Sequence, residues 1–219
     1  APEIVRSDDW HASTWMLALP GGADRPYCAA LNGPGNASIL RFVEAGGAFF
    51  GVCAGAYYAS ARISFEATPP GSITGDRELA LFPGTAIGSL HELAAPYALD
   101  HLRCAAVARL HAPGLERDLH ALYWGGPVFV PDPGVAVEPL LTYTTRQGGL
   151  AALRVQRGKG RVVLTGVHAE ITGEQFPIEV SRFDQASFDH GMQVSATLSR
   201  LQADRERAFE LLVEALQLG

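Results

Sequence analysis

The chain has 219 residues, of which 47% are hydrophobic and 18% are charged, a balance that is ordinary for a globular protein with a packed core. This length predicts a single domain over residues 1–219. The net charge of -6 and the absence of any run of Lys or Arg argue against a nucleic-acid-binding protein. No apolar run is long enough for a membrane span, so no membrane partner is expected.

The three cysteines, Cys28, Cys53 and Cys104, are odd in number and lie at unrelated spacings. This is neither a disulfide framework nor a zinc pattern, and it suits a reducing compartment. The histidines other than His168 have no metal-like spacing, so we expect no metal and no cofactor. The chain starts at Ala1 without a signal-like segment, which predicts a cytoplasmic protein, although a processed N-terminus would leave no signal to see.

In the first third of the chain, short apolar runs alternate with a helical pattern. Residues 3–6 are a weak strand candidate, and residues 15–19 are a better one. The second run leads into a Pro-Gly-Gly turn at 20–24, where glycine frees the backbone to present N–H groups. Residues 37–45 carry apolar side chains on one face and are followed by two glycines, which predicts a helix that ends there.

The rest of the chain contains mostly strand patterns. Residues 68–88 are rich in Pro and Gly and are expected to form a long irregular excursion, and residues 171–201 are expected to be irregular and polar. Asp204 is expected to cap a final amphipathic helix. These elements predict an α/β fold with a largely parallel sheet, helices on both faces and an antiparallel extension. The expected strands cover residues 103–110, 119–124, 140–144, 151–156 and 161–167, the last two joined by a hairpin turn at 157–160.

The chain is organised around a predicted strand, turn and helix at residues 48–61. Residues 48–52 have the pattern of a buried strand, Cys53 follows them with small neighbours on each side, and an Ala-rich helical run begins at Ala54. A reactive side chain at such a bend is the arrangement of a nucleophile elbow. A helix N-terminus also favours the thiolate. A buried structural cysteine explains the same local pattern equally well.

Two polar residues far downstream supply a base and its orienting group. His168 follows the strand pattern at 161–167, at the kind of strand end where α/β sites collect, and it can take the proton of Cys53. Glu170 is two residues further on and can hold the imidazole in one tautomer. Taken alone, this segment is most simply a loop with a solvated carboxylate.

Backbone N–H groups complete the expected site. The N–H of Ala54 and one from Gly21 or Gly22 can form an oxyanion hole. Two glycines after a strand are, by themselves, usually only a turn. Because the four features fall at four strand ends of one α/β pattern, we favour a thiol site over separate structural explanations.

Several motifs then carry a family resemblance over almost the whole chain. Gly-Val-Cys-Ala-Gly at 51–55, with His168 and Glu170 downstream, resembles the class I glutamine amidotransferase-like superfamily. More narrowly, the chain resembles the domain at the N-terminus of eukaryotic biotin–protein ligases, which also occurs alone in bacterial proteins. The motifs that carry this narrower resemblance lie at 20–27, 31–36, 53–60, 75–79, 82–84, 124–127 and 166–170.

The resemblance implies a flavodoxin-like sheet and a Cys-His-Glu triad made by Cys53, His168 and Glu170. The superfamily normally opens with a strand and a helix, whereas only about a dozen residues precede Trp15 here, enough for one short strand. The opening strand and helix are therefore expected to be missing, which leaves a gap in the sheet unless the chain is truncated or another segment fills it. Ala169 stands where many amidotransferases have Pro.

The function expected from these residues is that of a stand-alone, amidotransferase-like thiol hydrolase. It would act on an amide C–N bond of a small-molecule substrate whose identity the sequence does not give. A synthase or ligase partner that takes the ammonia is not identifiable, nothing resembles a biotin-adenylating site, and a homodimer stays open. The loop residues expected to line the pocket are Asp24, Tyr27, Asn32, Tyr57 and Arg77.

Two alternatives stay open at this point. The first is a metabolite-binding or regulatory module that keeps the pocket without turnover, because no second catalytic domain is recognisable. The second is a different thiol chemistry on the same fold, which would need an acidic residue close to Cys53 and before the elbow. The nearest upstream candidate, Glu44, falls on the predicted helix, so we rank this alternative lower.

Overall fold

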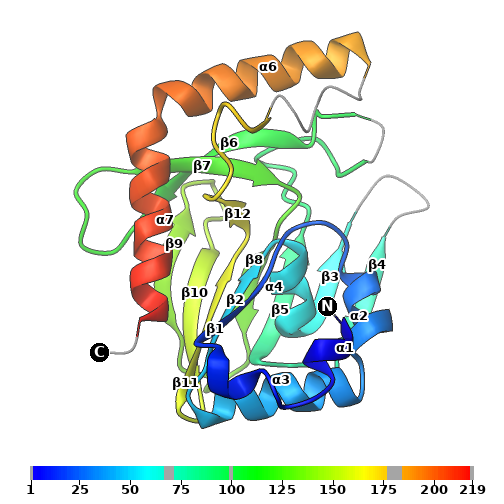
Figure 1. Cartoon of the computed structure of the whole chain (residues 1–219). Helices are drawn as coiled ribbons and strands as arrows, with labels where there is room; N and C mark the ends of the chain where they lie inside the picture. Colours follow the sequence, from blue (N-terminus) through cyan, green and yellow to red (C-terminus); the bar gives the residue numbers. More distant parts are fainter. Residues whose placement is uncertain (1, 67–71, 99–100, 177–183, 218–219) are drawn as a thin grey trace.

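The computed structural model describes residues 2–66, 72–98, 101–176 and 184–217, and these form a twisted mixed sheet flanked by helices (Figure 1). The helices are α1 Pro2–Val5, the 3-10 helix η1 His11–Ser13, α2 Asp24–Leu31, α3 Pro34–Ala45, α4 Ala54–Ala59, α6 Gln185–Arg200 and α7 Gln202–Leu216. The strands are β1 Met16–Leu19, β2 Ala48–Val52, β3 Ser60–Phe65, β4 Ile73–Asp76, β5 Phe82–Gly88, β6 Ala105–His111, β7 Leu119–Trp124, β8 Val128–Pro131, β9 Glu138–Tyr143, β10 Leu150–Arg157, β11 Gly160–Thr165 and β12 Val167–His168.

The α/β class is confirmed, but the sheet is mixed rather than mostly parallel. Strands β1, β2 and β11 are parallel neighbours, and β3 pairs with β5 in parallel. The other pairings within the described residues are antiparallel, among them β6 with β7 and β10 with both β9 and β11. Short links such as the turn between β10 and β11 impose this direction, because a parallel crossover needs a dozen or more residues.

The gap expected from a missing opening strand does not lie beside β2. Strand β1 pairs with one edge of β2, with Met16 opposite Ala48, and β11 pairs with the other edge, with Arg161 opposite the same residue. The weak strand candidate at residues 3–6 was wrong, because Pro2–Val5 form the short helix α1. The strand β11, which comes late in the chain, is therefore the second parallel neighbour of the elbow strand.

Two segments that were expected to be irregular contain regular structure. The described part of 68–88 holds β4 and β5, while residues 67–71 lie outside the described residues. The described part of 171–201 holds α6, whose first turn is capped by Asp184 accepting from the Ser187 N–H at 2.8 Å. Asp204 does not cap α7, because that helix already begins at Gln202.

Helices cover both faces of the parallel strands, and β2 shows this most directly. Phe49 packs with Ile39 and Val43 of α3, whereas its neighbour Phe50 packs in the cluster that contains Leu212 of α7. Successive side chains of a strand point to opposite faces, so α3 and α7 lie on opposite sides of the sheet (Figure 1). All five residues of β2 are buried, which makes this strand the centre of the core.

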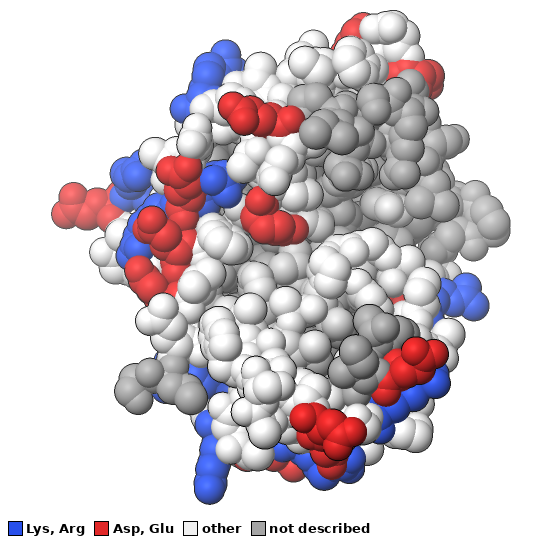
Figure 2. Space-filling view, in the orientation of Figure 1, with Lys and Arg blue, Asp and Glu red and all other residues white. Residues whose placement is uncertain are grey.

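The surface carries charges of both signs. Figure 2 shows acidic and basic side chains intermingled along the flank where α7 lies, and there Arg207 pairs with Glu210 at 3.0 Å and with Glu214 at 2.9 Å. Among the helices of the described residues, none is long and apolar enough to cross a bilayer. The visible flank therefore offers alternating charge rather than a uniform basic patch.

Replacing Gly55 by Ala is expected to destabilise the protein by about 2 kcal/mol, because an added methyl group would overlap the Leu19 carbonyl oxygen and would force β1 and α4 apart. Chemical denaturation monitored by circular dichroism would measure this loss. The matched control is Gly35→Ala in α3, where the nearest atoms are those of the Leu31 side chain at 3.1 Å and helix propensity favours Ala. Equal stability of Gly55→Ala and the native protein would contradict the tight β1–α4 contact.

Candidate active site

Cys53 occupies a strained bend between β2 and α4. Its φ of 49° is positive, a region that non-glycine residues rarely adopt, and the next residue opens the helix. The bend is held from two sides, since Cys53 N donates to Thr165 O of β11 at 2.9 Å and Gly55 N donates to Pro20 O at 3.2 Å. Such strain persists only where the surrounding structure enforces it, and here the ends of β1 and β11 do so.

The imidazole of His168 joins the other two expected triad side chains. His168 sits in β12, where it pairs with Leu122 of β7, and its side chain is only 7% exposed. Its Nδ1 lies 2.7 Å from Glu170 Oε1, and Cys53 is close enough to raise the pKa of the imidazole. Since Nδ1 faces the carboxylate, Nε2 is the ring nitrogen left for the sulfur. The structure thus brings together three residues that span 117 positions of the sequence.

The surroundings of His168 favour its charged form. Burial by itself lowers the pKa of this imidazole, but hydrogen bonds to Cys53 and Glu170, together with the charges of both groups, raise the pKa to about 10. A protonated imidazole beside a thiol stabilises the thiolate. The sulfur has a second neighbour, because Cys53 Sγ lies 3.7 Å from Trp124 O and can donate to it when it carries a proton.

The glycine turn after β1 lies against the imidazole. A methyl group added to Gly21 would fall 2.5 Å from Cε1 of His168, so only glycine permits this approach. Gly22 follows with a φ of 128° and open space around it. Ala54 begins α4, and the N–H groups of a helix's first turn have no partner within the helix. Of the three residues expected to form an oxyanion hole, Ala54 therefore follows Cys53 directly and Gly21 lies against His168, whereas Gly22 has no such contact within the described residues.

Two of the expected pocket residues are tyrosines close to the sulfur. Tyr57 donates to Gly125 O at 3.1 Å and Tyr27 donates to Pro20 O at 3.0 Å. Burial raises the pKa of Tyr57 well above its usual value and also raises the pKa of Tyr27, and in both cases the Cys53 charge adds to the shift. Both phenols therefore stay neutral at physiological pH and act as hydrogen-bond donors.

The other expected pocket residues separate into a buried pair and an unrelated loop residue. Arg77 Nε lies 2.6 Å from Asp24 Oδ2, and each side chain is only 10% exposed. Asp24 opens α2 directly after the glycine turn. Asn32 Oδ1 instead accepts from Asn36 Nδ2 at 3.2 Å in the α2–α3 connection, and no contact between Asn32 and the triad is found in the described residues.

The end of β7 is a part of the site that the sequence reasoning did not assign. The Trp124 carbonyl faces the sulfur, and the Gly125 carbonyl accepts from Tyr57. A side chain on Gly125, whose φ is 73°, would meet the ring of Tyr97 at 2.5 Å. The Trp-Gly-Gly-Pro motif at the end of a predicted strand was the signal for this wall. In the part of the chain described, no three His, Cys, Asp or Glu side chains are grouped to hold a metal ion.

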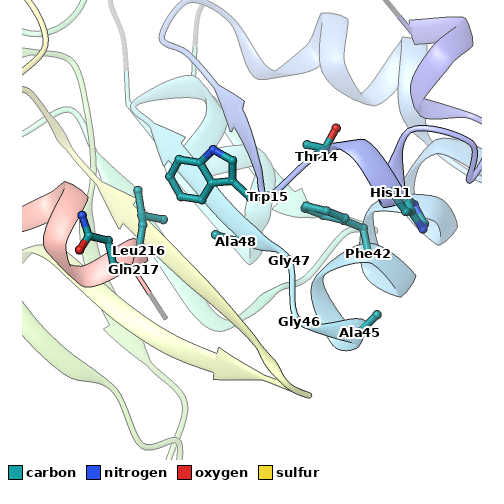
Figure 3. A pocket seen from close by; sticks show the side chains of 10 residues that line it. All are labelled: His11, Thr14, Trp15, Phe42, Ala45, Gly46, Gly47, Ala48, Leu216 and Gln217. Atoms are coloured by element: carbon teal, nitrogen blue, oxygen red, sulfur yellow. The ribbon is translucent and has the colours of Figure 1, made fainter. Parts of the chain in front are cut away.

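A surface hollow of about 570 Å³ lies away from this site (Figure 3). Trp15, Gly47 and Ala48 line it at the start of β1 and β2, together with Phe42 and Leu216. Cys53 follows the other end of β2, and five strand residues span roughly 15 Å. The hollow and the Cys53–His168–Glu170 group are therefore at opposite ends of the parallel strands.

Comparison with known proteins places the chain in a family. The family model described as "Biotin-protein ligase, N terminal" matches residues 1–219. The chain belongs to the biotin-protein ligase N-terminal family. A biotin–protein ligase of Schizosaccharomyces pombe is 33% identical over 181 residues, and an uncharacterised protein of Chlamydia muridarum is 38% identical over 174 residues.

This family member corresponds to a part of its curated relatives. The alignments cover 80% of this chain and 28% of the yeast ligase, and 78% of this chain and 66% of the Chlamydia protein. Among solved structures, the cytoplasmic protein STM1381 of Salmonella typhimurium LT2 is 10% identical with a TM-score of 0.48, covering 90% of this chain and 79% of that chain. The family assignment therefore rests on the family model, which matches the whole chain.

Replacing Cys53 by Ala is expected to lower the pKa of His168 below its native value of about 10, because the sulfur's hydrogen bond and charge both favour the imidazolium while burial opposes it. A pH titration of the His168 ring resonances by NMR would measure the midpoint. The control is Cys28→Ala on α2, which should leave the midpoint unchanged. An unaltered midpoint in the Cys53→Ala protein would show that the two side chains do not interact.

Replacing Arg77 by Met is expected to destabilise the protein by about 3 kcal/mol, because it leaves the Asp24 carboxylate buried without its partner. The double variant Asp24→Asn/Arg77→Met should recover part of this loss, since the neutral amide is less costly to bury. Urea denaturation of the native protein, both single variants and the double variant gives the coupling free energy. A coupling near zero would contradict a stabilising pair.

Proposed function

We propose that this protein is a thiol hydrolase of the amidotransferase type, with Cys53, His168 and Glu170 as its triad. The observation that carries the proposal is the position of the His168 ring, which lies beside Cys53 with its Nδ1 2.7 Å from Glu170 Oε1. A nucleophile, a base and an orienting carboxylate in this order are the elements of triad catalysis.

The reaction that fits this geometry is hydrolysis of an amide through a thioester. The Cys53 thiolate attacks the carbonyl carbon, and the developing oxyanion is bound by the N–H of Ala54 and an N–H of the Gly21–Gly22 turn. The His168 imidazolium gives its proton to the leaving nitrogen, the C–N bond breaks and the amine departs. Neutral His168 then takes a proton from water, whose oxygen attacks the thioester and releases the acid and Cys53.

The fold supports the same proposal at a coarser level. In this proposal, the parallel neighbours β1, β2 and β11 correspond to part of the flavodoxin-like sheet of class I glutamine amidotransferases. Asp24, Tyr27, Tyr57 and Arg77 lie on the elements around the elbow and would contact a small-molecule substrate. The ligase relative's own activity is not carried over, because this chain corresponds to 28% of its length.

A second candidate function is favoured by the burial of the site. Cys53 and His168 are 7% and 6% exposed, so little of either side chain is open to a substrate. A metabolite-binding or regulatory module needs the pocket but not the turnover, and it would tolerate such burial. The two functions differ in whether the sulfur is activated and whether a bond is broken.

Iodoacetamide labelling is expected to modify Cys53 at pH 6 at least tenfold faster than free cysteine, because the His168 imidazole beside it can take the proton of an attacking thiol. Peptide mapping by mass spectrometry after timed labelling gives a rate for each cysteine, with Cys28 as the internal comparison. His168→Asn should reduce the Cys53 rate at pH 6 by about 100-fold, since the positive partner is lost. Glu170→Gln should give a smaller reduction.

Hydrolysis of a panel of amides and esters by the native protein, with Cys53→Ala as the control, then separates the two candidates. Turnover that depends on Cys53 supports the hydrolase. Equal binding of one metabolite by both proteins, without hydrolysis, supports the binding module. A Cys53 that labels no faster than free cysteine, together with no hydrolysis, would rule out the activated nucleophile.

A further inference from the structure

An arginine on α7 reaches into the segment that carries the base and its orienting group. Arg205 Nη1 donates to Ala169 O at 2.6 Å, and Ala169 lies between His168 and Glu170. The Arg205 side chain is only 9% exposed, and Ala169 is fully buried. Arginine is rarely buried unless its guanidinium is matched by acceptors. The burial of this side chain therefore indicates that the contact with the Ala169 carbonyl is specifically built.

The acceptors around Arg205 are unevenly divided between the interior and the surface. Its Nη2 lies 3.4 Å from Glu206 Oε1, and the Glu206 side chain is 47% exposed, so this pair is screened by solvent. The bond to Ala169 is the short, buried one, and hydrogen bonds from a charged donor are stronger than neutral ones. The strongest hydrogen bond of Arg205 is therefore the one to the Ala169 carbonyl.

The start of α7 is itself fastened to β7. Asp204, which precedes Arg205, lies 2.8 Å from Nδ1 of His120 and also contacts Arg117, and its side chain is 10% exposed. His120 belongs to β7, the strand that pairs with β12 through Leu122 and His168. Strand β7 therefore holds both groups: it binds Asp204, the neighbour of Arg205, and it pairs with the backbone of His168.

These contacts leave the triad segment with little freedom. Strand β12 is only two residues long, and the pairing with β7 ends at His168. Beyond it, the carbonyl of Ala169 is the next backbone group held by a described contact. That carbonyl belongs to the planar peptide unit between Ala169 and Glu170. A hydrogen bond that holds the carbonyl therefore also sets the direction in which the Glu170 side chain points. The 2.7 Å contact between Nδ1 and Oε1 depends on this direction.

We propose that Arg205 is a positioning residue that holds the Ala169 carbonyl and thereby keeps Glu170 aligned with His168. This inference rests on the proposed triad for its catalytic meaning, but its physical content is the His168–Glu170 hydrogen bond. Arg205 touches neither the sulfur nor a substrate in this role. Loss of the Arg205 side chain therefore affects His168 and the reactivity of Cys53 indirectly, because Glu170 is no longer held in line with the imidazole.

The test compares Arg205→Met with Arg207→Met. Methionine fills much of the space of arginine without a donor, and Arg207 is a solvent-accessible arginine on the same helix that pairs with Glu210 and Glu214. The first readout is the Nδ1–H proton resonance of His168, which reports the hydrogen bond to Glu170 whether or not the protein is catalytic. The second is the pH profile of Cys53 labelling by iodoacetamide. Arg205→Met should broaden or remove the resonance and slow labelling at pH 6 by about tenfold, and Arg207→Met should change neither.

Arg205→Lys keeps the charge but replaces the planar fork by a single ammonium group, so it should shift the resonance and slow labelling by about threefold. A native resonance in folded Arg205→Met would overturn the inference. If Arg205→Met does not fold, Arg205→Lys decides, and a native resonance and rate in it would equally overturn the inference. A native protein whose Cys53 is unreactive would contradict the proposed function, while loss of the His168 resonance in Arg205→Met would still support the positioning role.

Discussion

The site depends on the parallel pairing of β2 with β1 on one edge and β11 on the other. Parallel strands end at the same edge of a sheet, so the glycine turn, Cys53 and the segment that leads to His168 all emerge there. The bend at Cys53 is then held by hydrogen bonds to Pro20 O and Thr165 O, which belong to the ends of the two neighbours. The register of three strands thus sets the distances among residues that are far apart in the sequence.

The remaining strands surround this parallel unit and supply walls for the site. The β7 strand contributes most, because its last residue presents a carbonyl to the sulfur, its middle pairs with β12, and its second residue binds α7. Buried phenols add a neutral lining, since Tyr57 donates to Gly125 O and its pKa is raised by burial. The site is therefore formed by the junction of the parallel and antiparallel regions rather than by either one alone.

The sequence predicted well what depends on local pattern. The alternation around β1, α3 and β2 and the bend at Cys53 were readable, because periodicity and glycine placement act over short distances. The order and relative direction of the strands could not be predicted, since they depend on pairings between distant segments such as β2 and β11. Helix α6 was also missed, because its apolar residues Phe188, Val194 and Leu198 are diluted among polar ones and become visible only against β6 and β7. Arg205 had no sequence signal at all, because its partner is a backbone carbonyl.

The positive φ of Cys53 limits which side chains can replace it at the bend. Serine has the same branching as cysteine and could occupy the bend without new crowding at Cβ. Threonine could not do so cheaply, because a second substituent on Cβ is strongly disfavoured in this backbone region. The bend could thus carry a hydroxyl group after a single substitution to serine, whereas threonine would strain the backbone at this position.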